Sequence, residues 1–194
     1  MYKLYLIGDK RYSFEKISSI LEIGGIDYFQ LRLKSISTKE FLKEALRYKE
    51  VCQKEGIKFI INDNLDVAIE VGSDGIHIGQ DDIPFKEVKR VFDGIVGIST
   101  HNISQAKEAK ELGADYIGFG SIYPTKTKKD ANVVGVEALC EVCKIDDLNV
   151  CAIGGIDEKN FKEVLSCKPK FIAISSAILS SSDPKMAIKK LRSC

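Results

Sequence analysis

The chain has 194 residues, 44% of them hydrophobic and 29% charged, a balance typical of one globular domain, which we place at residues 1–194. Its formal net charge is +1 and its lysines are scattered, so we expect no nucleic-acid partner. No apolar run approaches the roughly 20 residues of a membrane-spanning helix, and MYKLYLIGDKRY lacks a signal-peptide pattern, so we expect a cytoplasmic protein without a membrane partner.

Short β-branched runs alternate with helical patterns along the chain. The expected strands are 2–7, 27–31, 58–61, 75–78, 94–98, 116–119, 150–153 and 171–175. The expected helices are 14–23, 37–54, 65–71, 84–91, 103–112, 135–143, 158–165 and 184–192. Ser37 and Glu40 predict a capping box at the start of the second helix, and Asp183 is the expected N-cap of the last. Strands that alternate with helices indicate right-handed βαβ units and a parallel sheet. Eight such units favour a closed (β/α)8 barrel, the TIM barrel, over an open doubly wound sheet.

The longest connection, GSIYPTKTKKDANVV at 120–134, follows the sixth expected strand. Connections longer than about 12 residues are usually functional or disordered, and we interpret this one as functional. Its segment PTKTKKD, at 124–130, contains three lysines and two threonines. Such a loop suits a small anionic ligand.

Polar residues also follow the other strands, at the end of a barrel where catalytic groups lie. They are Gln30, Arg32, Lys34, Asn62, Asp63, Gln80, Asp81, Asp82, Ser99 and His101. Basic side chains suit phosphate oxygens, while two carboxylates on adjacent strands suit a hard cation such as Mg2+. This combination predicts a diphosphate held through a metal ion.

A second phosphate site is expected after the seventh and eighth strands. Barrels often bind phosphate there, and the chain has Gly155 in IGGI and the pair Ser175 and Ser176 in SSAI. A glycine lets backbone amides approach, and a short helix adds a favourable dipole. Two phosphate sites on one rim imply two phosphorylated substrates, or one substrate with two such ends.

Taken together, the motifs resemble the thiamine-phosphate synthase family, also called thiamin phosphate pyrophosphorylase. The resemblance runs in order through nearly the whole chain, by way of YLIGD, QLRLK, IND, GIHIGQDD, GISTH, ADYIGFGSIYPTKTKKD, IGGI and SSAI. It implies a barrel that joins 4-amino-5-hydroxymethyl-2-methylpyrimidine diphosphate to a thiazole phosphate and releases pyrophosphate. It also implies Mg2+ as the cofactor and these two small molecules as the substrates.

The resemblance assigns roles residue by residue. It places pyrimidine diphosphate contacts on Gln30, Arg32, Lys34, Asn62, Ser99 and Lys128. It places magnesium ligands on Asp63 and Asp82, and thiazole phosphate contacts on Thr125, Thr127, Gly155, Ser175 and Ser176. Arg32, Lys34 and Lys128 are the expected catalytic residues, because they would stabilise charge on the leaving pyrophosphate.

Four residues depart from the family's usual pattern: Leu33, Asn64, Ser121 and Ser175. None of these departures removes a residue with an assigned contact. Leu33 alternates away from Arg32 and Lys34, so we expect altered surroundings and an intact reaction. A contact made through the backbone amide of Ser175 would survive any side chain.

Other interpretations stay open at this point. Asp63 and Asp82 could each cap the following helix, and the chain could be a thiazole tautomerase or a non-catalytic sensor of phosphorylated thiamine precursors. His77 is expected to be a packed or rim histidine and His101 a loop contact. We interpret all six cysteines as packing residues, because the CxxC of Cys140 and Cys143 lacks further zinc ligands. No histidine or cysteine stands out as a nucleophile, which favours a dissociative reaction.

Overall fold

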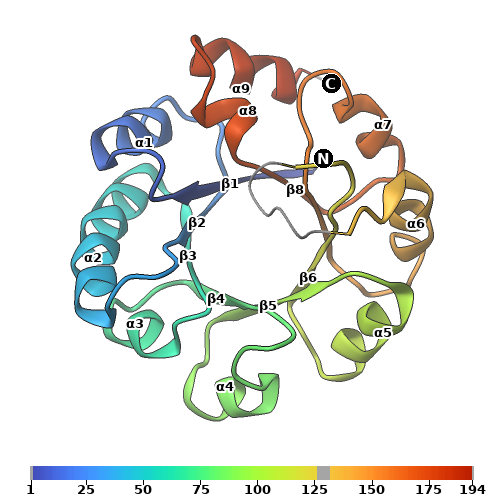
Figure 1. Ribbon diagram of the computed structural model, residues 1–194, viewed down its shortest axis with the longest axis horizontal. Helices are drawn as coiled ribbons and strands as arrows, with labels where there is room; N and C mark the ends of the chain where they lie inside the picture. The colour runs from blue at the N-terminus through green and yellow to red at the C-terminus, as the bar shows by residue number, and fades with distance from the viewer. Residues whose placement is uncertain (1, 126–131, 194) are drawn as a thin grey trace.

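The computed structural model describes residues 2–125 and 132–193, and its eight parallel strands close into a barrel in the order β1 to β8 (Figure 1). The strands are β1 (Lys3–Asp9), β2 (Tyr28–Arg32), β3 (Lys58–Asn62), β4 (Gly75–Ile78), β5 (Ile95–Thr100), β6 (Tyr116–Phe119), β7 (Val150–Ile153) and β8 (Phe171–Ile174). The helices are α1 (Phe14–Leu21), α2 (Thr38–Glu55), α3 (Leu65–Glu70), α4 (Phe85–Val91), α5 (Ile103–Glu111), α6 (Gly135–Val142), α7 (Phe161–Ser166), α8 (Ser176–Leu179) and α9 (Pro184–Arg192). The predicted (β/α)8 barrel is confirmed.

Most element boundaries lie within two residues of the sequence prediction, and two larger differences stand out. The helix predicted from residue 158 begins at Phe161, because Asn160 Oδ1 accepts the Asp157 amide at 2.9 Å and closes a turn before it. The short helix α8 was not predicted, since four residues are too few to show a helical period. The capping box of Ser37 and Glu40 and the N-cap Asp183 are confirmed.

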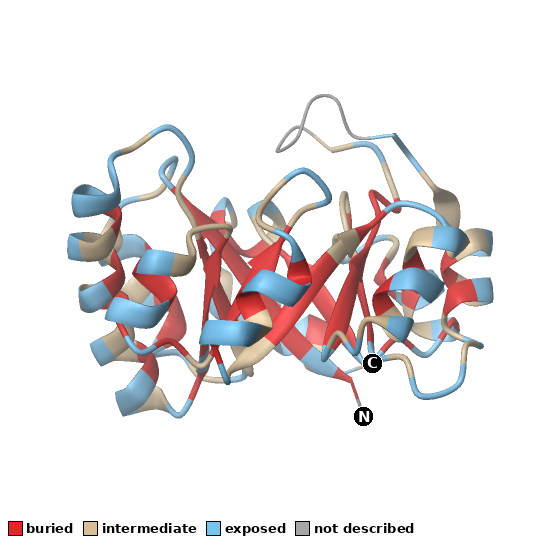
Figure 2. Cartoon of the chain, turned by 90° about the horizontal axis from the view of Figure 1, so that it is seen from below, coloured by how far each residue is buried: buried red, intermediate tan, exposed pale blue. Residues whose placement is uncertain are grey.

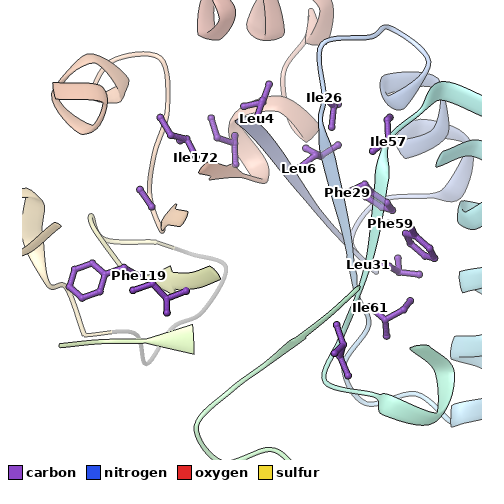
Figure 3. Close-up of a cluster of buried hydrophobic side chains, with 14 of the residues drawn as sticks. Leu4, Leu6, Ile26, Phe29, Leu31, Ile57, Phe59, Ile61, Phe119 and Ile172 are labelled. Carbon is purple, nitrogen blue, oxygen red and sulfur yellow. The ribbon is translucent and has the colours of Figure 1, made fainter. Parts of the chain in front are cut away.

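Alternating side chains of the strands build two apolar layers. The outer layer lies between strands and helices, and Figure 3 shows Leu4 and Leu6 of β1 there with Phe29 and Leu31 of β2. A smaller layer fills the barrel interior, with Tyr5, Ile7, Ile60, Tyr116, Cys151, Phe171 and Ala173. Figure 2 shows the buried strands at the centre and the exposed faces of the helices turned outward. The barrel interior is therefore packed, and ligands must bind at its rim.

The interpretation of all cysteines as packing residues is wrong for one pair. Cys140 of α6 and Cys167, directly after α7, form a disulfide. The two cysteines are 27 residues apart, and only the packing of α6 against α7 brings them together, so no local pattern announces the pair. Cys52, Cys143 and Cys151 are free thiols. In the part of the chain that the structure describes, no helix combines the length and apolarity needed to cross a membrane.

Candidate active site

Three predicted site residues meet at the carboxyl ends of β2, β3 and β4. Lys34 Nζ forms an ion pair with Asp63 Oδ2. The Asp63 carboxyl lies within hydrogen-bonding distance of the Asp82 carboxyl, and Asp82 Oδ2 accepts the backbone amide of Gly79 at 2.7 Å. Parallel strands bring these loops to one end of the barrel, as the sequence predicted. The result is a cation and two carboxylates in contact.

The pKa values of the two carboxyl groups are shifted in opposite directions. Burial, and then the neighbouring Asp82, raise the pKa of Asp63 despite the ammonium group of Lys34. Burial opposes ionisation of Asp82 as well, but hydrogen bonds from Asp63 and from the Gly79 amide outweigh it and lower the pKa of Asp82. Two carboxylates in contact repel each other, so such a site favours a bound proton or cation.

The capping interpretation of the two aspartates is contradicted. The N-cap of α3 is Asn64, whose side chain accepts the Val67 amide at 3.0 Å. Pro84 stands at the N-cap of α4, and no side chain caps that helix. Asp63 has a left-handed backbone with φ of 62°, and its amide donates to the carbonyl of His77 at 2.8 Å. Neither aspartate is therefore needed to begin a helix, and the departure at Asn64 supplies a helix cap.

Gln30 and Ser99 lie at opposite ends of a hydrogen-bonded chain inside the barrel. Gln30 Nε2 donates to the hydroxyl of Tyr5 at 2.9 Å, and the hydroxyls of Tyr5 and Tyr116 are 2.9 Å apart. His77 Nδ1 lies 2.9 Å from the Tyr116 hydroxyl, and His77 Nε2 lies 2.9 Å from Ser99 Oγ. Burial lowers the pKa of His77 to about 4, so the ring is neutral near pH 7. The expectation of a packed histidine at His77 is confirmed.

Sequence reasoning missed both tyrosines of this chain. Tyr5 and Tyr116 lie within apolar strand runs and read as core residues. The one available signal was the alternation of each strand, which turns these hydroxyl groups into the barrel together with Gln30 and His77.

Arg32 and Asn62 complete the rim on the side of β2 and β3. Arg32 ends β2, where it is paired in register with Asp9 of β1. Burial of Asp9 opposes its ionisation, but hydrogen bonds from Arg11 and the charge of Arg32 lower the pKa of its carboxyl. Asn62 is buried at the end of β3. Leu33 packs half-buried against the outer apolar layer, as its alternation predicted.

The second predicted region lies after β7 and β8. A Cβ at Gly155 would meet the carbonyl oxygen of Pro124 at 2.6 Å and Tyr123 Cβ at 2.7 Å. Tyr123 donates from its hydroxyl to Glu163 Oε2 at 2.6 Å. The start of the 120–134 connection, including the half-buried Thr125, is therefore seated against the diglycine. Sequence reasoning did not predict this contact.

The remaining members of the predicted phosphate site lie beside this contact. β7 pairs with β8, so the loop of Gly155 adjoins Ser175 and Ser176 at the end of β8. Ser175 Oγ is the one buried side-chain oxygen or nitrogen without a hydrogen-bond partner among the described residues. Thr127 and Lys128 lie outside the described residues.

His101, the second histidine, forms hydrogen bonds to neighbouring segments of the protein. His101 Nδ1 lies 2.6 Å from the carbonyl oxygen of Gly120, and the His101 amide donates to Gln105 Oε1 at 2.8 Å. These bonds join the loop after β5 to the residue after β6 and to α5. The expectation of a loop contact at His101 is confirmed.

Comparison with known proteins identifies the family. A model described as thiamine monophosphate synthase matches residues 4–178. The chain belongs to the thiamine monophosphate synthase family. A thiamine-phosphate synthase of Persephonella marina is 42% identical over 195 residues, covering 97% of this chain and 93% of that protein. One of Methanobrevibacter smithii is 40% identical over 193 residues, covering 97% and 92%.

A solved structure agrees with these sequence relatives. The thiamine phosphate pyrophosphorylase of Pyrococcus furiosus is 34% identical, has a TM-score of 0.90, and is matched over 94% of its chain and 98% of this one. The thiamine monophosphate synthase family predicted from the motifs is confirmed, and with it the barrel fold and the transferase class of the activity. The roles of individual residues stay predictions.

Proposed function

We propose that this chain is a thiamine-phosphate synthase that transfers a pyrimidinylmethyl group from pyrophosphate to the ring nitrogen of a thiazole phosphate. The observation that carries this proposal is the contact of Lys34, Asp63 and Asp82 at the rim, in a chain of this family. Cations and a metal-binding carboxylate pair suit a diphosphate leaving group.

Mg2+ is the proposed cofactor, and the donor set fits it. Among the described residues there is no cluster of three or more His, Cys, Asp or Glu side chains, so Asp63 and Asp82 would hold the ion as a pair. Mg2+ commonly takes one or two carboxylates from a protein and completes its shell with water and phosphate oxygens. The raised pKa of Asp63 is consistent with a site that favours a cation. Bound there, the ion would help to neutralise the charge that develops on pyrophosphate.

The residues of this chain would act on the leaving group and on the substrate's position. Arg32 and Lys34 would donate hydrogen bonds to the diphosphate as its bond to the methylene carbon breaks. With Mg2+ held by Asp63, Lys34 would pair with the diphosphate instead of with Asp63. The pyrimidine methylene cation would then be captured by the thiazole nitrogen, held nearby through its phosphate at Gly155, Ser175 and Ser176.

The loop after β6 would keep water from this cation. Thr125 and Thr127 would bind the thiazole phosphate, and Lys128 would bind the diphosphate. Exclusion of water matters because a methylene cation exposed to water is hydrolysed to the alcohol. Lys128→Ala should slow coupling and raise the share of hydrolysed pyrimidine. Chromatography of the products would measure that share, and an unchanged rate and product ratio would make the loop only a connector.

One assay tests the proposed reaction directly. Protein supplied with the pyrimidine diphosphate, the thiazole phosphate and Mg2+ should release pyrophosphate and form thiamine phosphate in equal amounts. Chelation of the metal should stop both. Binding of the two substrates without pyrophosphate release would instead favour a non-catalytic sensor, and isomerisation of the thiazole alone would favour a tautomerase.

A further inference from the structure

The hydrogen-bonded chain inside the barrel connects two predicted pyrimidine contacts through three residues with no assigned role. Tyr5 and Tyr116 are 1% and 2% exposed, and His77 is 8% exposed. Their polar atoms link Gln30 on β2 to Ser99 on β5 through β1, β6 and β4. A satisfied polar network in an apolar core fixes one arrangement of its members.

Two glycines make room for this chain. A Cβ at Gly97 would lie 2.2 Å from the Tyr116 ring, and a Cβ at Gly118 would lie 3.0 Å from Cε1 of His77. Both glycines face the barrel interior on β5 and β6, directly against the rings. The strand sequences therefore accommodate the two rings at the cost of apolar packing.

The direction of the hydrogen bonds follows from the first bond. Because Gln30 donates to Tyr5, the Tyr5 hydroxyl proton has only Tyr116 as an acceptor among the described residues. Tyr116 then donates to His77 Nδ1. A neutral imidazole that accepts at Nδ1 carries its proton on Nε2, which donates to Ser99 Oγ. The reverse direction would leave the buried Tyr5 proton unpaired, which proteins avoid.

We propose that Tyr5, Tyr116 and His77 are positioning residues that fix Ser99 as a hydrogen-bond donor, and Gln30 as an acceptor, toward the substrate. Ser99 Oγ accepts from His77, and no other described residue bonds to this hydroxyl, so its own proton is available to a ligand. The Gln30 amide donates to Tyr5, so its oxygen faces the ligand. No described residue bonds to Gln30 Oε1. If this oxygen were buried, it would be a buried atom without a partner, but among the described side chains Ser175 Oγ is the one such oxygen or nitrogen. Gln30 Oε1 is therefore accessible from the rim.

This polarity selects a class of ligand, an inference that rests on the proposed function. An aminopyrimidine offers what the two residues require, namely N–H donors on its exocyclic amino group and lone pairs on its ring nitrogens. The corresponding oxopyrimidine has a carbonyl oxygen in place of the amino donor and carries a proton on a ring nitrogen. A site of fixed polarity should reject it, because buried polar groups would be left unpaired.

Nitrogen NMR on the ligand-free protein tests the direction of the chain without reference to the reaction. The sequence contains two histidines, so His77→Gln assigns the His77 signals by their loss. At neutral pH, His77 should show a protonated Nε2 and an unprotonated Nδ1. A proton on Nδ1, or a doubly protonated ring, would overturn the proposal.

Variants test whether the tyrosine hydroxyls set this direction. Tyr5→Phe removes the group that receives the Gln30 bond, so Tyr116 can donate or accept, and both tautomers of His77 should appear. Tyr28→Phe is the matched control, because Tyr28 is also a barrel tyrosine. Its ring centroid lies 5.6 Å from that of Tyr5, but its hydroxyl is not part of the hydrogen-bonded chain. A single unchanged tautomer in Tyr5→Phe would show that the chain does not set the polarity.

Ligand binding tests the consequence for specificity. The probes are the monophosphate esters of the aminopyrimidine and of its oxo analogue, which lack a pyrophosphate leaving group and do not react. The unmodified protein and Tyr28→Phe should prefer the amino ester, and Tyr5→Phe should lower that ratio of Kd values by about tenfold. An equal ratio in all three proteins would overturn the specificity role. If His77 carries its proton on Nε2 but the protein does not form thiamine phosphate, the synthase proposal is rejected and the proposed direction of the hydrogen bonds stands.

Discussion

Asp63 combines two features that cost stability, and both lie at the proposed metal site. Its backbone is left-handed, at φ of 62°, and its carboxyl lies against that of Asp82. Non-glycine residues in this conformation persist where the surrounding structure holds them, often at functional sites. We therefore expect stability and activity to respond in opposite directions when the Asp63 charge is removed.

The first prediction concerns Asp63→Asn. The raised pKa of Asp63 means that the folded protein holds this proton more tightly than the unfolded chain, so stability is lost as pH rises through the folded pKa. Removing the charge should leave the metal-free melting temperature near pH 7 equal or higher. Turnover should fall by roughly 10²- to 10³-fold. Calorimetry and the pyrophosphate assay measure the two effects.

Asp82→Asn provides the contrast. The lowered pKa of Asp82 means that its carboxylate stabilises the fold at neutral pH, and this stability is lost as pH falls through the folded pKa. Asp82→Asn should therefore lower the melting temperature and also the turnover. If both residues hold one ion, the double variant should lose little more turnover than either single variant. Independent losses with an unchanged magnesium requirement would contradict the metal assignment.

His77 gives a prediction about acid stability. Burial lowers its pKa to about 4, whereas an unfolded histidine titrates near pH 6.5, so stability is lost as pH falls between these values. His77→Gln removes this titration. Between about pH 7.5 and 4.5 the unmodified protein should lose about 2 kcal/mol more unfolding free energy than the variant. Urea unfolding at the two pH values measures this difference, and parallel losses would contradict the buried neutral ring.

At the scale of elements, the contact between the diglycine and the 120–134 connection can be tested by a matched pair of glycines. Gly155 and Gly56 both have φ of 67°, but a Cβ at Gly56 meets nothing within 4 Å. Either change to alanine should cost roughly 1 kcal/mol of stability through the backbone. Only in Gly155→Ala does the new methyl group push against Pro124, so only this variant should raise KM for the thiazole phosphate. The expected rise is about tenfold or more, the effect of losing one contact to the phosphate.

Steady-state kinetics with each substrate varied in turn measures this effect. KM for the pyrimidine diphosphate should change less in Gly155→Ala, because all of its expected contacts except Lys128 lie on β2, β3 and β5 or directly after them. Equal KM values for the thiazole phosphate in Gly155→Ala and Gly56→Ala would show that the diglycine contact does not shape that site.

The elements themselves were largely predictable because their signals are local. Apolar runs and caps such as Ser37 and Asp183 placed the strands and most helix ends, and parallel strands then placed Lys34, Asp63 and Asp82 at one end. The later start of α7 was not predictable from a helical period, since it depends on a turn closed by a single side chain.

At the scale of the whole molecule, what the sequence did not predict are contacts across the barrel. The chain through Tyr5 and Tyr116 joins residues 111 positions apart, and the Cys140–Cys167 disulfide depends on how α6 lies on α7. Such contacts carry no periodic signal in one sequence. They appear only when closure fixes which strand faces which.

The amino ends of the strands contain a repeated contact that supports this closure. The residue before each of β2, β4 and β6 is an aspartate whose carboxylate accepts the amide of the second residue of the preceding strand. The three pairs are Asp27 with Leu4 at 2.7 Å, Asp74 with Phe59 at 3.0 Å and Asp115 with Val96 at 2.8 Å. A lysine also pairs with each aspartate. These contacts lie at the end opposite the site, where barrels build stability.

The last prediction separates the two ends of the barrel through Asp27→Ala and Asp74→Ala. Burial opposes ionisation of both carboxyls, but bonds from Leu4 and Arg192 lower the pKa of Asp27, and bonds from Lys58 and Phe59 lower that of Asp74. Their stabilisation is therefore present near neutral pH and is lost as pH falls through the lowered pKa values.

Each variant should lose about 1–3 kcal/mol of unfolding free energy near pH 7, because each removes hydrogen bonds to a charged group. The losses should sum in the double variant, since the two side chains share no partner among the described residues. Urea unfolding measures the losses, and the gap to the unmodified protein should narrow in acid. KM and kcat below the melting range should stay unchanged, because the site lies at the carboxyl ends of the strands. A fall in kcat without unfolding would mean that these contacts also set the geometry of the rim.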